Sequence, residues 1–195
     1  MGDGPIRIVG VIGAGTMGAG IAQVCSQVGW EVRLHDALPG GVEAGLLRIE
    51  EFWSKGVQKG KTDQTKVDEW RSNIIPSTLE EAALESDLII EAVPERMNLK
   101  HDIFKSLDSL TKEHTILATN TSSLSVGEIS KSTLNPERVV GMHFFNPVPL
   151  MPLVEIIRHD GTSPRTLDIA EYAVDKMGKS SIVVNDVPGF ATSRL

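Results

Sequence analysis

The stretch IRIVGVIGAGTMGAGIAQV, residues 6–24, decides the fold class of this chain. Its first seven residues are nearly all apolar and indicate a buried strand, and a helical pattern follows from Met17 to Val28. Between the two lies a turn in which Gly13, Gly15 and Gly18 have the spacing G-x-G-x-x-G. Glycine-rich turns are common, so the spacing alone is weak evidence. It is informative here because a strand leads into the turn and a helix follows it.

Each glycine of this turn has a physical role in binding a dinucleotide. Gly13 allows the tight turn, Gly15 lets the backbone approach a pyrophosphate, and Gly18 lets the helix pack close to the strand. The backbone N–H groups and the dipole of the helix attract the phosphates, which adds Thr16 and Met17 to the same site. The turn therefore predicts a bound dinucleotide.

Asp36 ends the next expected strand, about twenty residues beyond the turn, where dinucleotide-binding proteins have an acidic residue. Its carboxylate can accept hydrogen bonds from the adenosine ribose hydroxyls. The same charge would repel a 2′-phosphate, and no arginine occurs in the following ALPG. We therefore predict NAD rather than NADP as the cofactor.

Strands and helices alternate along the chain. This order predicts an α/β protein of the Rossmann type, with a doubly wound, mostly parallel sheet and helices on both faces. The expected strands are nearly solid apolar, as in a sheet that is buried on both sides. Strands are expected at residues 6–12, 31–36, 87–93, 115–120, 138–145, 153–158 and 181–186, and helices at 17–28, 40–59, 61–73, 78–86, 99–110, 125–132 and 163–178.

Composition excludes several classes of protein. The chain has 195 residues, enough for one sizeable domain, and its net charge of −7 argues against a general nucleic-acid binder. No apolar run approaches the length of a membrane span, and the start has no signal-peptide pattern. The single cysteine, Cys25, cannot form an intrachain disulfide or a Cys-based zinc site, and we assign no metal. A cytoplasmic setting is expected.

Two polar residues stand out in apolar runs, His143 in VVGMHFF and Glu155 in LVEII. A histidine in such a run is often a hydrogen-bonded core residue. However, hydride transfer with a nicotinamide cofactor also needs proton handling, to which a histidine oriented by a carboxylate is suited. The two would pair if the NPVP connection brings their strands side by side, because a lone buried charge is costly.

Two other segments follow expected strands and point to the same cleft, since ligands bind at the carboxyl ends of such strands. The stretch LATNTSSLS places Asn120 and Ser122 there, although Ser and Thr clusters also cap helices and turns. The stretch IIEAVPERMNLK places Glu91, Glu95 and Lys100 there, for which a solvated helix start is the alternative.

Taken together, the motifs resemble the NAD-binding domain of the 3-hydroxyacyl-CoA dehydrogenase family. The resemblance extends over nearly the whole chain, from VGVIGAGTMGAGIA through EAVPE, NTSSL and HFFNPVPLMPLVEI to PGFATSRL. It implies oxidation of an L-3-hydroxyacyl-CoA to the 3-ketoacyl-CoA with NAD, or the reverse, in fatty-acid β-oxidation or butanoate metabolism. A short-chain substrate such as 3-hydroxybutyryl-CoA is the leading expectation.

The family's catalytic roles transfer by matching motif. His143 corresponds to the catalytic base, Glu155 to the carboxylate that orients it, and Ser122 to the serine that hydrogen-bonds the substrate oxygen. Glu95 and Lys100 correspond to residues that line the cofactor site near the nicotinamide.

The resemblance also suggests the remaining ligand contacts. Asn120 is assigned to the cofactor and Asn146, in HFFNP, to the substrate. Lys59 matches a lysine that meets the phosphates of CoA, whereas Phe52 stands where the family commonly has a serine.

Two features depart from the family pattern. Ser193 occupies the place of an asparagine that the family counts with the substrate site, and we keep Ser193 as a candidate substrate-binding residue. The family also continues into a helical domain that completes the acyl cleft and forms a homodimer. We therefore expect residues 1–187 to form the NAD-binding domain and residues 188–195 to begin a helical domain that this chain lacks.

Two alternatives remain open from the residues alone. One is a related sugar-acid dehydrogenase, such as the gulonate dehydrogenase that also serves as a lens crystallin, whose HPVNPPY-like pattern differs from HFFNPVP. The other is a non-catalytic NAD-binding module that kept the fold and lost the chemistry.

Overall fold

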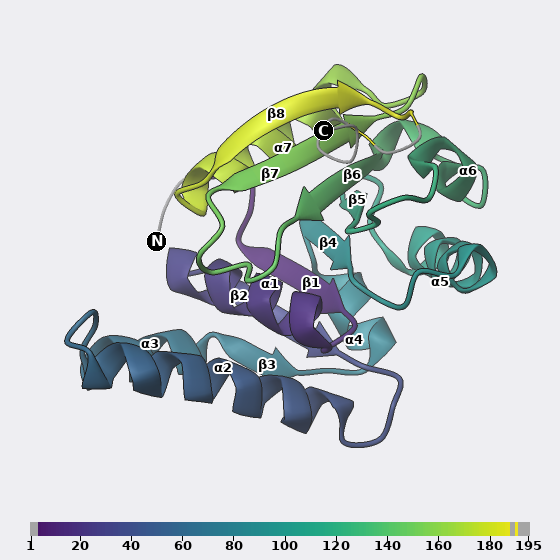
Figure 1. Ribbon diagram of the computed structural model, residues 1–195. Helices are drawn as coiled ribbons and strands as arrows, with labels where there is room; N and C mark the ends of the chain where they lie inside the picture. Colours follow the sequence, from purple (N-terminus) through teal and green to yellow (C-terminus); the bar gives the residue numbers. More distant parts are fainter. Residues whose placement is uncertain (1–3, 188–189, 191–195) are drawn as a thin grey trace.

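One mixed sheet organises the molecule in the computed structural model, which describes residues 4–187 and residue 190 (Figure 1). Its strands are β1 (Ile8–Ile12), β2 (Glu31–His35), β3 (Ile74–Pro76), β4 (Leu88–Glu91), β5 (Ile116–Thr119), β6 (Val139–Phe144), β7 (Leu153–Arg158) and β8 (Ser180–Asn185). The α-helices are α1 (Thr16–Val28), α2 (Gly41–Gln58), α3 (Gln64–Ser72), α4 (Leu79–Leu84), α5 (Met97–Leu110), α6 (Val126–Ser130) and α7 (Pro164–Lys176), and a 3-10 turn, η1, spans Pro136–Arg138.

The strand order is β3-β2-β1-β4-β5-β6-β7-β8, which confirms the predicted doubly wound sheet. Strands β1 to β6 run parallel, β7 is antiparallel to β6, and β8 is parallel to β7. Because β1 pairs with β2 on one side and with β4 on the other, the chain reverses its direction of winding there. Such a switch point opens a crevice at the carboxyl ends of the strands, where ligands bind.

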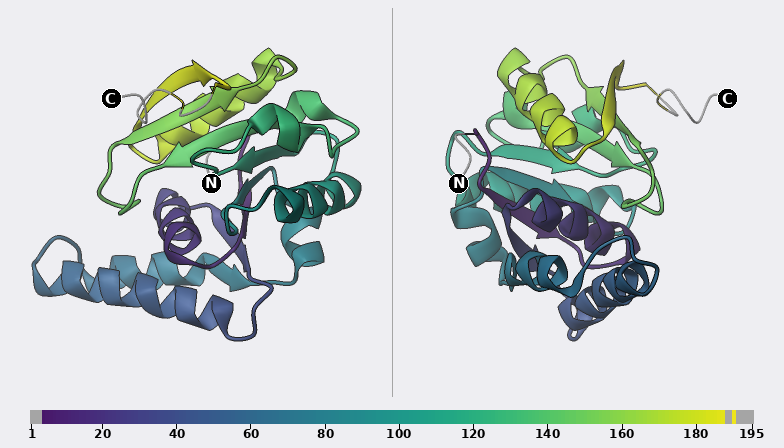
Figure 2. Two further views of the ribbon diagram at one scale, coloured as in Figure 1. Left: turned by 45° about the vertical axis from the view of Figure 1, so that its right-hand side comes forward. Right: turned by 90° about the vertical axis from the view of Figure 1, so that its left-hand side faces the viewer.

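Helices cover both faces of the sheet, as predicted, because the central strands are apolar on both sides (Figure 2). On one face α1, α2, α3 and α7 contribute buried side chains such as Ile21, Trp53 and Val174. On the other face α4, α5 and α6 contribute side chains such as Phe104 and Ile129. The two buried layers hold the switch point rigidly between them.

Helix boundaries follow the local signals of the sequence. Ser163 caps α7 by accepting a hydrogen bond from the backbone N–H of Thr166, and Pro164 opens the helix. Gly178, with φ of +68°, follows the helix end, as the sequence predicts.

The two edges of the sheet differ from the prediction. The short strand β3 was missed, because three residues give too little pattern to identify a strand. At the other edge β8 is not buried on both sides, since the side chains of Ile182 and Val183 are 45% and 38% exposed. Strand β8 is the edge strand with α7 against it, and on the other side Val184 packs only partly buried against the buried layer of α4, α5 and α6.

Some predictions fall outside the described residues. Ser193 lies there, as does most of the expected helical start at residues 188–195, of which only Phe190 is described. Within the described part of the chain, no helix combines the length and the apolar character needed to cross a membrane.

Candidate active site

The glycine turn has the geometry that its spacing predicts. Gly13 has φ of +99°, and its N–H donates to the carbonyl of His35 at 2.8 Å. A Cβ atom on Gly18 would lie 1.7 Å from the carbonyl oxygen of Gly13, so only glycine fits where α1 crosses the turn. Because glycine has no side chain, Gly13 and Gly18 let the start of α1 pack against the end of β1.

Gly15 is different, because a Cβ atom there would meet no protein atom within 4 Å. It is the N-cap residue of α1 and has no side chain to cap the helix, whose first N–H groups lack carbonyl partners within the helix. Open space in front of an uncapped helix N-terminus fits a pyrophosphate group. The residues at the turn therefore fit a dinucleotide.

Asp36, just after β2, lies beside this turn. Its Oδ2 accepts a hydrogen bond from the backbone N–H of Ala14 at 2.7 Å, and its Oδ1 accepts one from Leu38 at 2.9 Å. These bonds fix the carboxylate next to the glycine turn. Each oxygen has a further lone pair with which it can accept a ribose hydroxyl.

His143 and Glu155 face each other directly across the antiparallel pair of β6 and β7. Nδ1 of His143 lies 2.7 Å from Oε2 of Glu155, which confirms the predicted pairing. The Glu155 side chain is fully buried, whereas 12% of the His143 side chain is exposed. Because an ionised carboxylate only accepts hydrogen bonds, this contact places the proton on Nδ1 and leaves Nε2 as the acceptor.

His143 opens into a cleft of about 340 Å³. The cleft gathers residues from the start of α1 and from the segments that follow β4, β5 and β6, at the carboxyl ends of these strands. Its lining residues are Met17, Ala92, Val93, Glu95, Asn120, Ser122, His143, Phe144, Phe145 and Asn146. Segments far apart in sequence, each with a predicted site residue, therefore meet in one cavity.

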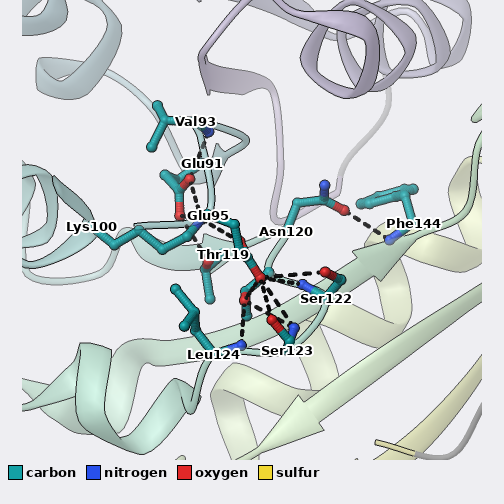
Figure 3. Close-up of polar contacts among 11 residues, drawn as sticks. Glu91, Val93, Glu95, Lys100, Thr119, Asn120, Ser122, Ser123, Leu124 and Phe144 are labelled. Atoms are coloured by element: carbon teal, nitrogen blue, oxygen red, sulfur yellow. Dashed lines mark hydrogen bonds and ion pairs between the residues drawn. The ribbon is translucent and has the colours of Figure 1, made fainter. Parts of the chain in front are cut away.

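Glu95 organises the turn that carries Ser122 (Figure 3). Its Oε1 accepts hydrogen bonds from the hydroxyl of Thr121 and from the backbone N–H groups of Ser122 and Ser123, at 2.9 and 3.1 Å. Burial acts to raise the pKa of Glu95, but the hydrogen bonds and the nearby charge of Lys100 hold that pKa below its usual range. Glu95 is therefore a carboxylate at neutral pH.

The alternative of turn capping applies to Thr121, whose Oγ1 accepts a hydrogen bond from the backbone N–H of Leu124 at 2.9 Å. Ser122 is different, because its hydroxyl lies 3.4 Å from Oε1 of Glu95 and lines the cleft. Asn120 also has a structural contact, since its Oδ1 accepts a hydrogen bond from the backbone N–H of Phe144 at 2.9 Å.

The alternative of a solvated helix start is wrong for Glu91 and Lys100. Both side chains are buried, and Nζ of Lys100 lies 2.7 Å from Oε1 of Glu91. The ammonium also lies 3.4 Å from Oε2 of Glu95. Lys100 stands behind Glu95 and is absent from the lining of the cleft, so its predicted contact with the cofactor stays a prediction.

Lys59 lies apart from His143, in a different cavity of about 290 Å³ beside Lys55 and Lys61. A cavity of about 130 Å³ between α1, α2 and residues 146–149 shares Phe52 with this lysine-lined cavity and Asn146 with the cleft. Thr16 lines this middle cavity as well. Cavities that share lining residues thus extend from His143 to the lysines.

Sequence reasoning missed the aromatic side chains around His143. The ring of Phe145 lies 4.6 Å from the imidazole, centroid to centroid, and that of Phe190 lies 6.0 Å away. Phe145 could have been found, because residues two apart on a strand share a face. Phe190 is remote in sequence and carries no such signal.

Glu155→Gln is expected to lower kcat by about a hundredfold, because a neutral amide stabilises the protonated imidazole less than a carboxylate does. Glutamine keeps the size of the side chain, so the fold is expected to persist. Steady-state kinetics of the proposed reaction and thermal unfolding would check both statements. Glu128→Gln, at an exposed position on α6, is the matched control and should leave kcat unchanged. A Glu155→Gln variant with the parent's kcat would contradict the role of the pair.

The fold and the glycine turn define a class, the dinucleotide-binding domains of the Rossmann type. Residues 8–187 match the family model described as "3-hydroxyacyl-CoA dehydrogenase, NAD binding domain". The chain is 47% identical over 192 residues to a probable 3-hydroxybutyryl-CoA dehydrogenase of Bacillus subtilis, and 45% identical over 185 residues to the 3-hydroxybutyryl-CoA dehydrogenase of Clostridioides difficile. These alignments cover 97% and 95% of this chain but 66% of each relative.

A solved structure agrees with the sequence relatives. The (S)-3-hydroxybutyryl-CoA dehydrogenase of Ralstonia eutropha superposes with a TM-score of 0.95 at 38% identity, over 97% of this chain and 67% of that one. The chain belongs to the 3-hydroxyacyl-CoA dehydrogenase family, of which it forms the NAD-binding domain. It spans about two thirds of the length of these relatives.

Proposed function

We propose that this chain catalyses the NAD-dependent interconversion of a short-chain L-3-hydroxyacyl-CoA and its 3-ketoacyl-CoA. One observation carries the proposal: the His143–Glu155 pair, with 2.7 Å between Nδ1 and Oε2, opens into the same cleft as Ser122 and the first turn of α1. An acid/base pair beside a dinucleotide turn is the arrangement that alcohol oxidation requires.

NAD, when bound, supplies the hydride chemistry. The protein's own part is the proton: Nε2 of His143 accepts it from the substrate hydroxyl during oxidation and returns it to the carbonyl oxygen during reduction. Glu155 keeps Nδ1 protonated and stabilises the positive charge that the imidazole acquires. Because Glu155 is buried, its charge is poorly screened by water and acts strongly on His143.

Ser122 is proposed to hold the substrate oxygen. Its hydroxyl makes only a long contact of 3.4 Å to Glu95, so it can turn toward a ligand at little cost. Glu95 meanwhile fixes the backbone of the turn through the N–H groups of Ser122 and Ser123. The hydroxyl is thereby held close to the oxygen on which the proton transfer takes place.

The chain of cavities supports a CoA thioester as substrate. An acyl group at His143 would leave the rest of a long ligand to follow the middle cavity toward Lys55, Lys59 and Lys61. Three lysines in an acidic protein form a local positive site that suits phosphates. Asn146, which lines both the cleft and the middle cavity, is proposed to contact the substrate between the two.

The names of the two sequence relatives support a four-carbon acyl group. For that substrate class we propose a role in fatty-acid β-oxidation or butanoate metabolism, in the cytoplasm. A homodimer is proposed for the protein once the helical domain of the family is present.

The test is to mix this chain with NADH and acetoacetyl-CoA and to follow the absorbance of NADH. We expect NADH to be oxidised in the presence of acetoacetyl-CoA. We expect no oxidation in the presence of the keto acid that forms when gulonate is oxidised. Acetoacetyl-N-acetylcysteamine, which keeps the thioester and lacks the phosphates, should react with a KM at least about tenfold higher, equivalent to about 1.4 kcal/mol of lost binding.

Other outcomes would overturn the proposal. Binding of NADH without turnover of any substrate would show that this chain alone is only a cofactor-binding module, and turnover of the sugar acid alone would favour the gulonate dehydrogenase. Equal KM values for the two thioesters would show that the lysines do not hold CoA.

A further inference from the structure

The buried pair of Glu91 and Lys100 has no part in the chemistry proposed above, although Lys100 contacts Glu95, which lines the cleft (Figure 3). Glu91 is the last residue of β4, and its two oxygens accept bonds from Nζ of Lys100 at 2.7 and 2.9 Å. They also accept bonds from the hydroxyl of Thr119 and the backbone N–H of Val93, both at 2.7 Å. These hydrogen bonds fix the Glu91 carboxylate at its buried position.

Lys100 connects the pair to the cleft. Its ammonium has a second carboxylate within reach, Oε2 of Glu95 at 3.4 Å. The other oxygen of Glu95 accepts hydrogen bonds from the backbone N–H groups of Ser122 and Ser123. A continuous polar chain therefore runs from the end of β4 through α5 to the turn that carries Ser122.

Stability alone gives a weak reason for such a pair. Removing two charges from water costs about as much as their attraction returns, and apolar replacements of buried pairs are often neutral or stabilising. What apolar side chains cannot supply is a positive charge fixed against Glu95. Without that charge, Glu95, whose side chain is 34% exposed, would keep only the hydrogen bonds of the turn and could move toward water more easily.

We infer that Glu91 and Lys100 are positioning residues of the active site. Glu91 fixes the ammonium of Lys100, Lys100 holds the carboxylate of Glu95, and Glu95 fixes the turn that presents Ser122 to the cleft. The inference rests on the proposed function for its kinetic consequence. Its structural consequence, a rigid turn at residues 121–123, holds independently of any substrate.

The decisive variant is the double substitution Glu91→Leu/Lys100→Met, which removes both charges together and leaves neither of them buried alone. We expect the double variant to fold with an unchanged or higher Tm. Its kcat should fall by about tenfold to a hundredfold, because Ser122 is misplaced relative to the reacting oxygen. Its KM should change much less.

Amide hydrogen exchange supplies a readout that does not depend on turnover. Exchange at the N–H groups of Ser122 and Ser123 should become at least about tenfold faster in the double variant, because their acceptor is no longer fixed. Gly127, whose N–H donates to Oδ2 of Asp186 at 2.8 Å, is the internal reference and should exchange as in the parent.

A second buried ion pair offers a matched control. Nη2 of Arg138 lies 2.7 Å from Oδ1 of Asp108, and both side chains are nearly buried. Asp108 is not part of the polar chain that leads to Ser122. Asp108→Asn is expected to lower Tm, while kcat and the exchange of the Ser122 and Ser123 amides stay as in the parent.

A folded double variant with unchanged exchange and unchanged kcat would overturn the inference, since the pair would then be structural only. If the double variant does not fold, Thr119→Val decides, because it removes one hydroxyl donor to Glu91 and keeps both charges. Faster exchange at Ser122 in that variant supports the inference, and unchanged exchange overturns it. Absence of turnover in the parent chain would refute the proposed function, but the hydrogen-exchange test would still decide whether Glu91 and Lys100 position the turn.

Discussion

His143→Asn is expected to lower kcat by about 10²- to 10⁴-fold, the range that a positioned general acid/base contributes. The amide Nδ2 of asparagine can still donate to Glu155, so the buried carboxylate keeps a partner and the fold is preserved. What is lost is the basic Nε2, on which the proposed proton transfer depends. The Kd for NADH should stay near that of the parent, because the glycine turn and Asp36 are untouched.

Steady-state oxidation of NADH by acetoacetyl-CoA measures the loss of kcat, and a fluorescence titration with NADH measures binding. His101→Asn is the matched control. That histidine is partly exposed and is absent from the lining of the cleft, and its ring contacts the carbonyl of Glu128, so kcat should not change. Turnover by His143→Asn close to that of the parent would show that His143 is not the acid/base group.

Gly15→Ala is expected to weaken NADH binding by about tenfold to a hundredfold, equivalent to about 1.4–2.8 kcal/mol, without unfolding the protein. The backbone of Gly15, with φ of −65° and ψ of −167°, lies in a region that alanine adopts readily. The added methyl group would meet no protein atom within 4 Å. It would instead project into the space where the pyrophosphate has to approach the helix.

Thermal unfolding and NADH titration separate the two effects. Gly56→Ala, within α2, is the control, because its Cβ atom would make only an ordinary contact of 3.4 Å with Thr62. That variant should bind NADH as the parent does and gain up to about 1 kcal/mol of helix stability. An unchanged NADH affinity in Gly15→Ala would show that the pyrophosphate does not bind at this helix terminus.

Features that depend on local sequence were predictable. The strand, glycine turn and helix at residues 6–28 are contiguous, and each local preference agrees with the others. The caps of α7 were predictable from the sequence for the same reason. The short strand β3 was not, since its pairing with β2 is what makes it a strand.

Burial was harder to predict than secondary structure. The residues of β8 read as a core strand, but the edge position leaves Ile182 and Val183 exposed. For Glu91 and Lys100 a solvated helix start was one of two interpretations, but the two side chains are buried together. In both cases the environment is set by contacts in three dimensions, through the sheet edge for β8 and through Thr119 of β5 for Glu91.

The sequence by itself determined the class of fold, the dinucleotide turn and the types of residue available for chemistry. Those properties depend on the conformational freedom of glycine, on apolar periodicity and on side-chain acidity, all of which act locally. Only the tertiary structure decided that His143 faces Glu155, that Ser122 shares their cleft, and that Lys100 stands behind Glu95. These arrangements depend on strand register and on packing between segments far apart in sequence, and a shift of one residue in register would turn His143 to the opposite face of the sheet.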